Sequence, residues 1–208
     1  MNTESTRTQI VQHAQRLIQE RGYNGFSYRD LAALIGIKTS SIHYYFPQKE
    51  NLVLAVVQEY LARWHAAMRD IDSGLTADAK LRAYVDAHRR TFCGTERICL
   101  GAALAADVAS MPACVRQALQ DFYAANENWL AALLEQGARE GSLRVPGDVR
   151  TAARALYAAL QGSLVSARLF KNSERVEDLL PAMVGADEPD AGTPRASSGY
   201  PENQASTA

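Results

Sequence analysis

The stretch from Phe26 to Glu50, FSYRDLAALIGIKTSSIHYYFPQKE, constrains the fold more than any other part of the chain. It holds two short segments with apolar residues at helical spacing, separated by Gly36 and closed by Pro47. Glycine suits a turn that needs a positive φ, and proline ends a helix because it lacks a backbone donor. Ser27 followed by Asp30 resembles a capping box. The pattern therefore predicts a helix-turn-helix over about residues 27–46.

The second of these helices carries small polar and basic side chains at the end that a helix-turn-helix presents to the major groove. The start of the first helix offers free N–H groups that suit a phosphate. The candidate DNA-binding residues are Ser27, Tyr28, Arg29, Lys38, Thr39, Ser40, Ser41, His43, Tyr44, Tyr45 and Lys49. Tyr45 and Phe46 fit packing better than DNA contact, and His43 fits a neutral hydrogen bond better than a charge switch. From the spacing alone, a hydroxyl-rich surface helix is an equal alternative to DNA binding.

Apolar residues at helical spacing continue along the chain, and no alternating strand pattern is present. We expect further helices over residues 6–21, 48–73, 76–93, 98–109, 112–140 and 148–171, and a last one capped by Ser173. The predicted fold is therefore all-α with about nine helices. Residues 185–208 contain no Leu, Ile, Val or Phe, which predicts a disordered tail. The expected domains are a DNA-binding domain at 1–50, a ligand-binding and dimerisation domain at 51–184, and that tail.

Charge and cysteine content limit the class of protein. The net charge of −1 argues against a polycationic binder, yet six basic residues oppose four acidic ones up to Leu52. The longest uncharged apolar run, Ile98 to Ala106, is too short to span a bilayer, and the polar N-terminus lacks the apolar segment of a signal peptide. Three cysteines form no disulfide framework. These features predict a reduced, cytoplasmic protein without membrane association.

Residues 6–54 resemble the DNA-binding head of the TetR/AcrR family of bacterial transcriptional regulators. The matching residues are Ala14, Leu17, Gly22, Phe26, Arg29, Leu31, Ala32, Gly36, Ile37, Ile42, Tyr45, Phe46, Lys49, Glu50 and Leu52. Lys38, Ser40 and His43 replace a small capping residue, a glycine and a tyrosine of the usual pattern, which leaves the operator sequence open. The resemblance implies an all-α homodimer that binds double-stranded operator DNA and is released by a ligand.

In this family the last long helices of two subunits form a four-helix interface, and small residues let helices approach closely. The candidate dimer residues here are Leu119, Trp129, Leu133, Ala155, Ala159, Gly162, Ser163 and Ser166. The alternative is that the alanines serve packing within one subunit.

A ligand pocket needs mostly apolar walls and a few polar groups. The candidate lining residues are Tyr84, His88, Phe92, Phe122, Asn126 and Trp129, with Asp107 or Arg168 as a charged group.

Cys99 is a separate candidate sensor. We expect it at a helix start beside Arg97, and both features favour the reactive thiolate. Its surroundings resemble, imperfectly, a glycine-cysteine-leucine-glycine stretch of relatives that respond to electrophiles or oxidants, with Ile98 in place of the first glycine. A buried, inert cysteine is the favoured alternative. A zinc site from His88, Cys93, Cys99 and Cys114 lacks paired spacing, so we expect no metal and no cofactor.

The predicted function is a homodimeric repressor that leaves its operator when a small molecule binds or when an electrophile or oxidant attacks a cysteine. A small-molecule-binding helical enzyme is one alternative, but the sequence has no nucleophile elbow, phosphate loop or HExxH motif. A DNA-binding protein without a sensing role is the other, and the size and aromatic content of the C-terminal part argue against it.

Overall fold

The computed structural model describes residues 5–71, 74–92, 97–145 and 147–183, and these ranges hold nine α-helices and two short 3-10 helices. The all-α prediction is confirmed. The expected tail, Cys93 and the side chain of Phe92 lie outside the described part.

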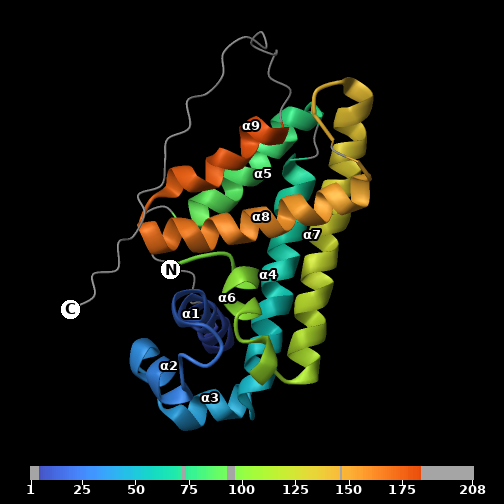
Figure 1. The fold of residues 1–208 in the computed structure, drawn as a ribbon. Helices are drawn as coiled ribbons and strands as arrows, with labels where there is room; N and C mark the ends of the chain where they lie inside the picture. Colours follow the sequence, from blue (N-terminus) through green and yellow to red (C-terminus); the bar gives the residue numbers. More distant parts are fainter. Residues whose placement is uncertain (1–4, 72–73, 93–96, 146, 184–208) are drawn as a thin grey trace, which may run out of the picture.

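The helices α1 (Thr6–Arg21), α2 (Tyr28–Ile35) and α3 (Thr39–Tyr45) gather at one end of the molecule (Figure 1). We call them the head, and the remaining helices the body. The head core is made of buried apolar residues that include Ile10, Ile18, Leu31, Ile42 and Leu52. The same cluster continues into the body through Leu100, Leu104 and Leu119. The expected boundary at residue 50 therefore falls within the first turn of α4 (Lys49–Ile71), and the head core extends into the body, which has a second core cluster of its own.

The body is built on two long helices, α4 and α7 (Ala113–Glu140), which pack side by side. The helix α8 (Val149–Phe170) crosses them, and α5 (Ala77–Phe92), η2 (Ser173–Leu179) and α9 (Leu180–Met183) cover its other side (Figure 1). The short α6 (Leu100–Ala105) and η1 (Val108–Ser110) follow one another at the junction, where α6 packs against α1, α7 and α8. This arrangement places α6 and α8 between the body core and the head.

Some expected helix boundaries are wrong. The segment expected as one helix over 98–109 divides into α6 and η1, with Asp107 between them. The last segment starts as a 3-10 helix capped by Asn172 rather than by Ser173, because the Asn172 side chain accepts from the backbone N–H of Glu174 (2.9 Å). Asp148 caps α8 as expected, accepting from the backbone N–H of Thr151 (2.9 Å).

Candidate DNA-binding face and regulatory core

Local signals in the sequence fix the helix-turn-helix. The Ser27 hydroxyl accepts from the Asp30 backbone N–H (3.3 Å), and the Asp30 carboxylate accepts from the Ser27 N–H (2.8 Å), so the capping box is present. Gly36 has φ of 79°, the left-handed conformation that favours glycine. Ile42 is fully buried and fixes one side of α3 to the head core. The opposite side of α3 is thereby held toward solvent.

The exposed side of α3 carries most of the candidate DNA contacts. Lys38, Ser40, His43 and Tyr44 are exposed, and Thr39 and Ser41 are partly buried. Lys38 is the N-cap residue, and its exposed ammonium has no acceptor with which to cap the helix. His43 uses Nδ1 in a 3.2 Å hydrogen bond with the Pro47 carbonyl. Small hydroxyls and a cation thus stand at the helix end that reads base edges.

Tyr44 and Tyr45 extend this face toward the end of α3. Tyr44 is 82% exposed, and the two rings meet edge to face with centroids 5.1 Å apart. The expectation that Tyr45 packs inward is wrong, since its ring is 40% exposed, whereas Phe46 is buried as expected. Both tyrosines are therefore available to a partner, and their hydroxyls suit phosphate oxygens.

Two other candidates point inward. The Tyr28 ring is buried and its hydroxyl donates to the Phe46 carbonyl (2.9 Å); burial raises the pKa of Tyr28 to about 12. The Lys49 ammonium donates to the Phe26 carbonyl (2.6 Å) and lies 4.2 Å from the centroid of the Phe26 ring. Desolvation lowers the pKa of Lys49. The sequence spacing suggested phosphate contacts for the Lys49 side chain, but in the structure it holds the loop before α2.

The start of α2 remains open to a phosphate. The Ser27 hydroxyl is committed to the Asp30 carboxylate (2.6 Å), whereas Arg29 is exposed on the first turn. The capping box uses the N–H groups of Ser27 and Asp30, which leaves those of Tyr28 and Arg29 without an intrahelical partner, as at any helix start. At α2, Arg29 and the backbone are therefore the better candidates for DNA contact.

The head is tied to the body at the end of α1. The Gln19 Nε2 donates to the Ile98 carbonyl (2.9 Å), and the Asp107 carboxylate accepts from the Tyr23 N–H (2.7 Å) and the Asn24 amide (3.1 Å). Arg168 of α8 donates to the carbonyl oxygens of Gln19 (3.4 Å) and Glu20. Asp107 and Arg168 were expected in the ligand pocket. The structure places them instead at this junction, beside an open recess of about 600 Å³.

Most of the predicted pocket residues lie together in the body core. The Tyr84 hydroxyl donates to the Asn126 amide oxygen (2.7 Å), and the Tyr84 ring stacks on Trp129 with centroids 5.0 Å apart. His88 is buried with Nδ1 3.0 Å from the Tyr84 carbonyl, and burial lowers the pKa of His88. Phe122 is also buried. These side chains satisfy one another, which makes them the wall of a core more than a set of free ligand contacts.

Cys99 is the N-cap residue of α6, as the sequence suggested, but its surroundings do not favour a thiolate. The side chain is fully buried, and desolvation raises the pKa of the thiol more than nearby hydrogen-bond donors lower it. This is the opposite direction to the expected one, because burial outweighs the helix start. In this conformation the thiol is protonated and shielded from electrophiles. Cys114 is exposed at the start of α7.

The candidate dimer residues separate into two groups. Leu119 and Leu133 are buried in the core of their own subunit, and Trp129 stacks on Tyr84. Ala155, Ala159 and Gly162 are exposed on one side of α8. Ser163 donates to the Leu160 carbonyl (2.8 Å), and Ser166 accepts from Arg175 (3.0 Å), so both hydroxyls have partners within the subunit.

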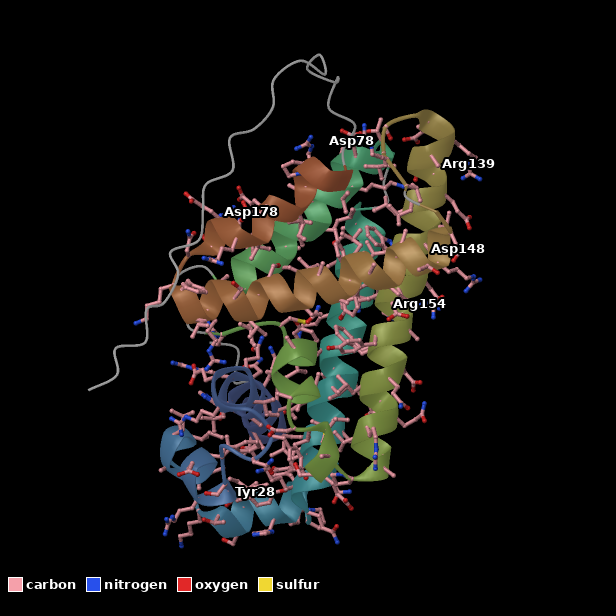
Figure 2. The ribbon with its side chains drawn as sticks, viewed as in Figure 1. Tyr28, Asp78, Arg139, Asp148, Arg154 and Asp178 are labelled. Carbon is pink, nitrogen blue, oxygen red and sulfur yellow. The ribbon has the colours of Figure 1, made fainter. Side chains whose placement is uncertain are left out.

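The exposed side of α8 also contains residues that the sequence pattern did not single out. Ala158 lies between the predicted positions, and Val165 and Leu169 are 49% and 75% exposed. The spacing of three to four residues puts them on the face of Ala155, Ala159 and Gly162. Arg154, labelled in Figure 2, begins this face near the start of α8. A solvent-facing apolar stripe of this kind is typical of an interface between proteins.

The described residues offer little support for a metal site or a membrane span. They contain no group of three or more His, Cys, Asp or Glu side chains that could hold a metal ion. Within the same ranges, no helix is long and apolar enough to cross a membrane.

Comparison with known proteins gives matches along most of the chain. Residues 10–56 match the model of the bacterial regulatory proteins of the tetR family, and residues 77–183 match the model of the tetracyclin repressor-like C-terminal domain. The HTH-type transcriptional repressor NemR of Escherichia coli is 25% identical over 180 residues, covering 84% of this chain and 90% of NemR.

Two solved structures of TetR-family regulators have the same fold. The one from Agrobacterium tumefaciens has a TM-score of 0.81 at 29% identity, covering 86% of this chain and 97% of that protein. The one from Legionella pneumophila has a TM-score of 0.79 at 32% identity, covering 88% of this chain and 97% of its own.

Proposed function

Because this chain belongs to the TetR family of bacterial regulatory proteins and is a DNA-binding transcriptional regulator, we propose that it acts as a homodimeric repressor that a small effector releases from DNA. The observation that carries the proposal is the orientation of α3. Ile42 is buried, while Lys38, Ser40 and Tyr44 face solvent. The name of the relative NemR, a transcriptional repressor, supports repression as the direction of control.

Double-stranded DNA is the partner that this face fits. The hydroxyls of Thr39, Ser40 and Ser41 are short enough to approach base edges, and the two tyrosines suit the phosphates beside them. Two copies of the face, held about one helical turn of DNA apart, are needed for a palindromic operator. The exposed stripe on α8 supports a second copy of this chain as the other partner.

The proposed effector acts on the body, which is connected to the head. The body core is joined to α1 by Gln19, Asp107 and Arg168, so a ligand that moves α6 or α8 changes the orientation of the head. Direct attack of an electrophile on Cys99 is a second route to release. It requires prior opening of the core, because the thiol is buried and its pKa is raised.

A gel shift with the DNA upstream of its own gene tests the proposed function. We expect a retarded band at low salt that weakens steeply as salt rises, because protein cations displace the counterions of phosphates. DNA of equal length and base composition but scrambled sequence serves as the control and should compete poorly. Absence of a shift on the upstream DNA and on neighbouring promoters would contradict local repression.

A further inference from the structure

Three side chains of the body carry buried polar atoms that have no hydrogen-bond partner among the described residues. These atoms are the Trp64 indole Nε1, the Tyr157 hydroxyl, and both the oxygen and the nitrogen of the Gln161 amide. Tyr157 is 1% exposed and Gln161 is 7% exposed. A buried polar group without a partner is costly and rare in native proteins. Such a cluster therefore needs a reason other than stability.

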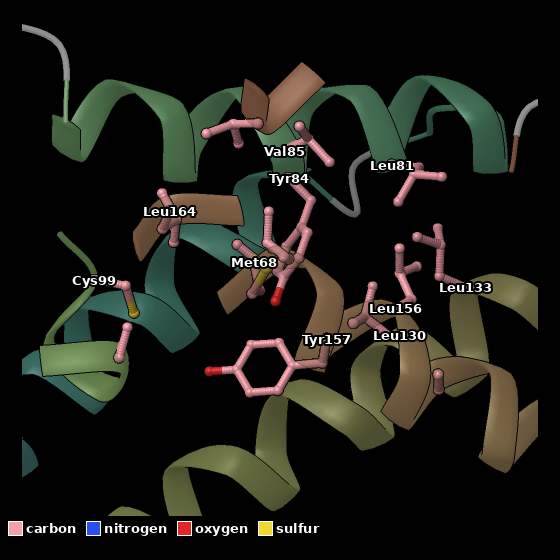
Figure 3. Close-up of a cluster of buried hydrophobic side chains, with 14 of the residues drawn as sticks. Met68, Leu81, Tyr84, Val85, Cys99, Leu130, Leu133, Leu156, Tyr157 and Leu164 are labelled. Atoms are coloured by element: carbon pink, nitrogen blue, oxygen red, sulfur yellow. The ribbon is translucent and has the colours of Figure 1, made fainter. Parts of the chain in front are cut away.

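Two of the three side chains, Tyr157 and Gln161, lie near Cys99. The Gln161 amide is close enough to the Cys99 thiol to lower its pKa, although burial has the larger effect. On the other side, the Tyr60 hydroxyl contacts the Cys99 sulfur at 3.8 Å. Figure 3 shows the Tyr157 hydroxyl on the side of its ring that faces Cys99. The helices α4 and α8 thus bring Tyr60, Tyr157 and Gln161 to Cys99 at the start of α6.

A recess between α4 and α5 adjoins this cluster through Tyr60 and Trp64. It measures about 180 Å³ and is lined by Tyr60, Trp64, Met68 and His88, with Arg63 at its exposed edge. Arg63 already donates to the Gln15 amide oxygen and lies over the Tyr60 ring. An apolar cavity of about 150 Å³ accepts a molecule of the size of benzene. The recess therefore suits a molecule of about one ring.

The buried side chains in this region are neutral near pH 7, and the cation Arg63 lies at the exposed edge of the recess. Desolvation raises the pKa of Tyr60, Tyr84, Tyr157 and Cys99, and it lowers the pKa of His88. The buried Lys80 is engaged with Gln136 (3.0 Å) near the far end of α7. A charged ligand that reached the buried groups would lose its hydration there, and Arg63 at the edge of the recess is already engaged with Gln15 and the Tyr60 ring, so a charged ligand is disfavoured.

We propose that Gln161, Tyr157 and Trp64 form the polar part of the effector site, and that the effector is a small uncharged molecule with both a hydrogen-bond acceptor and a donor. A primary amide or an alcohol on a single ring has this chemistry. The Gln161 amide donates and accepts at once, and the Trp64 indole only donates. This inference rests on the function proposed above, since it names the ligand class of that regulator.

The site is connected to two of the elements that contact α1, namely α8 and the segment before α6. Gln161 lies two helical turns before Arg168 on α8, and Cys99 follows Ile98, whose carbonyl accepts from Gln19 (2.9 Å). A ligand that engages Gln161 and displaces the Cys99 segment therefore acts on two of the polar links between body and head. Occupation of the site is in this way coupled to the orientation of α1.

Thermal unfolding with small probes tests the ligand class on the full chain. Benzamide and benzyl alcohol are the uncharged probes, and benzoate is the charged analogue of benzamide. We expect the two uncharged probes, at millimolar concentration, to raise the melting temperature of the wild type, and benzoate to leave it unchanged. An equal effect of benzoate, or no effect of either uncharged probe, would overturn the proposal.

Two variants locate the binding. Gln161→Leu and Tyr157→Phe should weaken benzamide binding about tenfold or more, because each removes a hydrogen-bonding group. Without a probe, both should melt at or above the temperature of the wild type, since each removes an unpartnered polar group. A merely structural glutamine would instead give a lower melting temperature in Gln161→Leu. Gln117→Leu, at an exposed glutamine on α7, is the matched control and should bind benzamide as the wild type does.

A drop in the melting temperature of both variants, or unchanged benzamide binding in both, would overturn the assignment of the site. The gel shift without a probe keeps the two proposals apart. A protein that shifts its upstream DNA but ignores the uncharged probes retains the proposed repressor function and loses the inferred ligand class. A protein that binds benzamide through Gln161 but shifts no DNA loses the proposed function instead.

Discussion

Gln19 of the head donates a 2.9 Å hydrogen bond from Nε2 to the carbonyl of Ile98, the residue directly before Cys99. The Gln19 side chain is 4% exposed, so this contact is shielded from water. Its own backbone carbonyl accepts from Arg168 of α8 (3.4 Å). One residue of α1 is therefore hydrogen-bonded both to the segment before α6 and to α8. Movement of either element should change the position of α1 and, with it, of the DNA-binding face.

Replacing Asp107 should loosen this junction without unfolding the head core. Asp107→Ala leaves the Tyr23 N–H without its acceptor and removes one of the two acceptors of the Asn24 side-chain amide, which should cost about 1–3 kcal/mol of stability. We expect faster amide hydrogen exchange at Tyr23 and at the end of α1, measured by mass spectrometry or NMR. Asp121→Ala, at an exposed carboxylate that accepts from Gln117 in its own helix, is the control. Unchanged exchange at Tyr23 would show that Asp107 is not a link.

Lys49 and Lys38 should behave differently although both are lysines of the DNA-binding head region. Lys49→Met removes the bond to the Phe26 carbonyl and the cation over its ring, and should lower the stability by about 1–2 kcal/mol. Lys38→Met should change stability little, because the Lys38 side chain makes no capping bond, but should reduce the salt dependence of DNA binding by about one phosphate contact. Urea unfolding and salt titrations measure both. The reverse result would restore Lys49 as a phosphate contact.

Substitutions on the exposed face of α3 should distinguish residues that read the base sequence from residues that anchor the protein to DNA phosphates. Tyr44→Phe removes one hydroxyl from a ring that is 82% exposed, and should weaken binding to all DNA sequences alike. Thr39→Ala and Ser41→Ala should change the preferred base at one position of each half-site, by about 1–3 kcal/mol. Binding to a randomised operator library measures the preference. If the three variants show the same preference as the wild type, the division between reading and anchoring residues is wrong.

The head was predictable because its determinants are local in sequence. Ser27 and Asp30, the positive φ at Gly36 and the buried Ile42 all lie within one short stretch, and each has one suitable conformation. The direction of the Lys49 side chain was not predictable, because the accepting carbonyl of Phe26 lies 23 residues earlier. Spacing along a helix shows which side a residue occupies but not what it meets there.

In the body too, helical spacing shows which side of a helix a residue occupies but not which residues it contacts. The apolar positions Leu119, Leu133 and Ala155 all fit a helix face, yet the first two are buried within the subunit and the third is exposed. The Asp107 carboxylate accepts from the Tyr23 N–H, although the two residues are 84 positions apart in the sequence. The buried Gln161 amide has no hydrogen-bond partner among the described residues, and no sequence pattern indicates this. A polar residue beside the apolar stripe of α1, Gln19, was the one available signal for the junction.

Burial predicts slow chemistry at Cys99. Its raised pKa leaves little thiolate, and the reagent must wait for the core to open, so iodoacetamide should modify Cys99 about tenfold or more slowly than the exposed Cys114. Peptide mass spectrometry at timed intervals measures both rates in one sample. In urea the two rates should converge, which controls for differences between the peptides. Equal rates in the native protein would favour Cys99 as a direct target of electrophiles.

The exposed stripe on α8 predicts that two copies of the protein assemble through this helix. A Cβ atom added at Gly162 would have no neighbouring atom within 4 Å in the subunit, and Gly162 lies in the interior of the helix α8. Gly162→Leu should therefore be accommodated by the isolated subunit and should favour α8 by about 0.5–1 kcal/mol through helix propensity. At a close helix–helix interface the same side chain clashes with the second copy.

We expect Gly162→Leu to shift the protein from dimer to monomer in sedimentation experiments while its helical circular dichroism is retained. Operator binding should weaken in parallel, because a monomer contacts only one half-site. Ala138→Leu, at an exposed position near the end of α7, should leave both properties unchanged. A Gly162→Leu protein that remains fully dimeric would place the interface elsewhere, because a leucine cannot occupy the space of a glycine between two tightly packed helices.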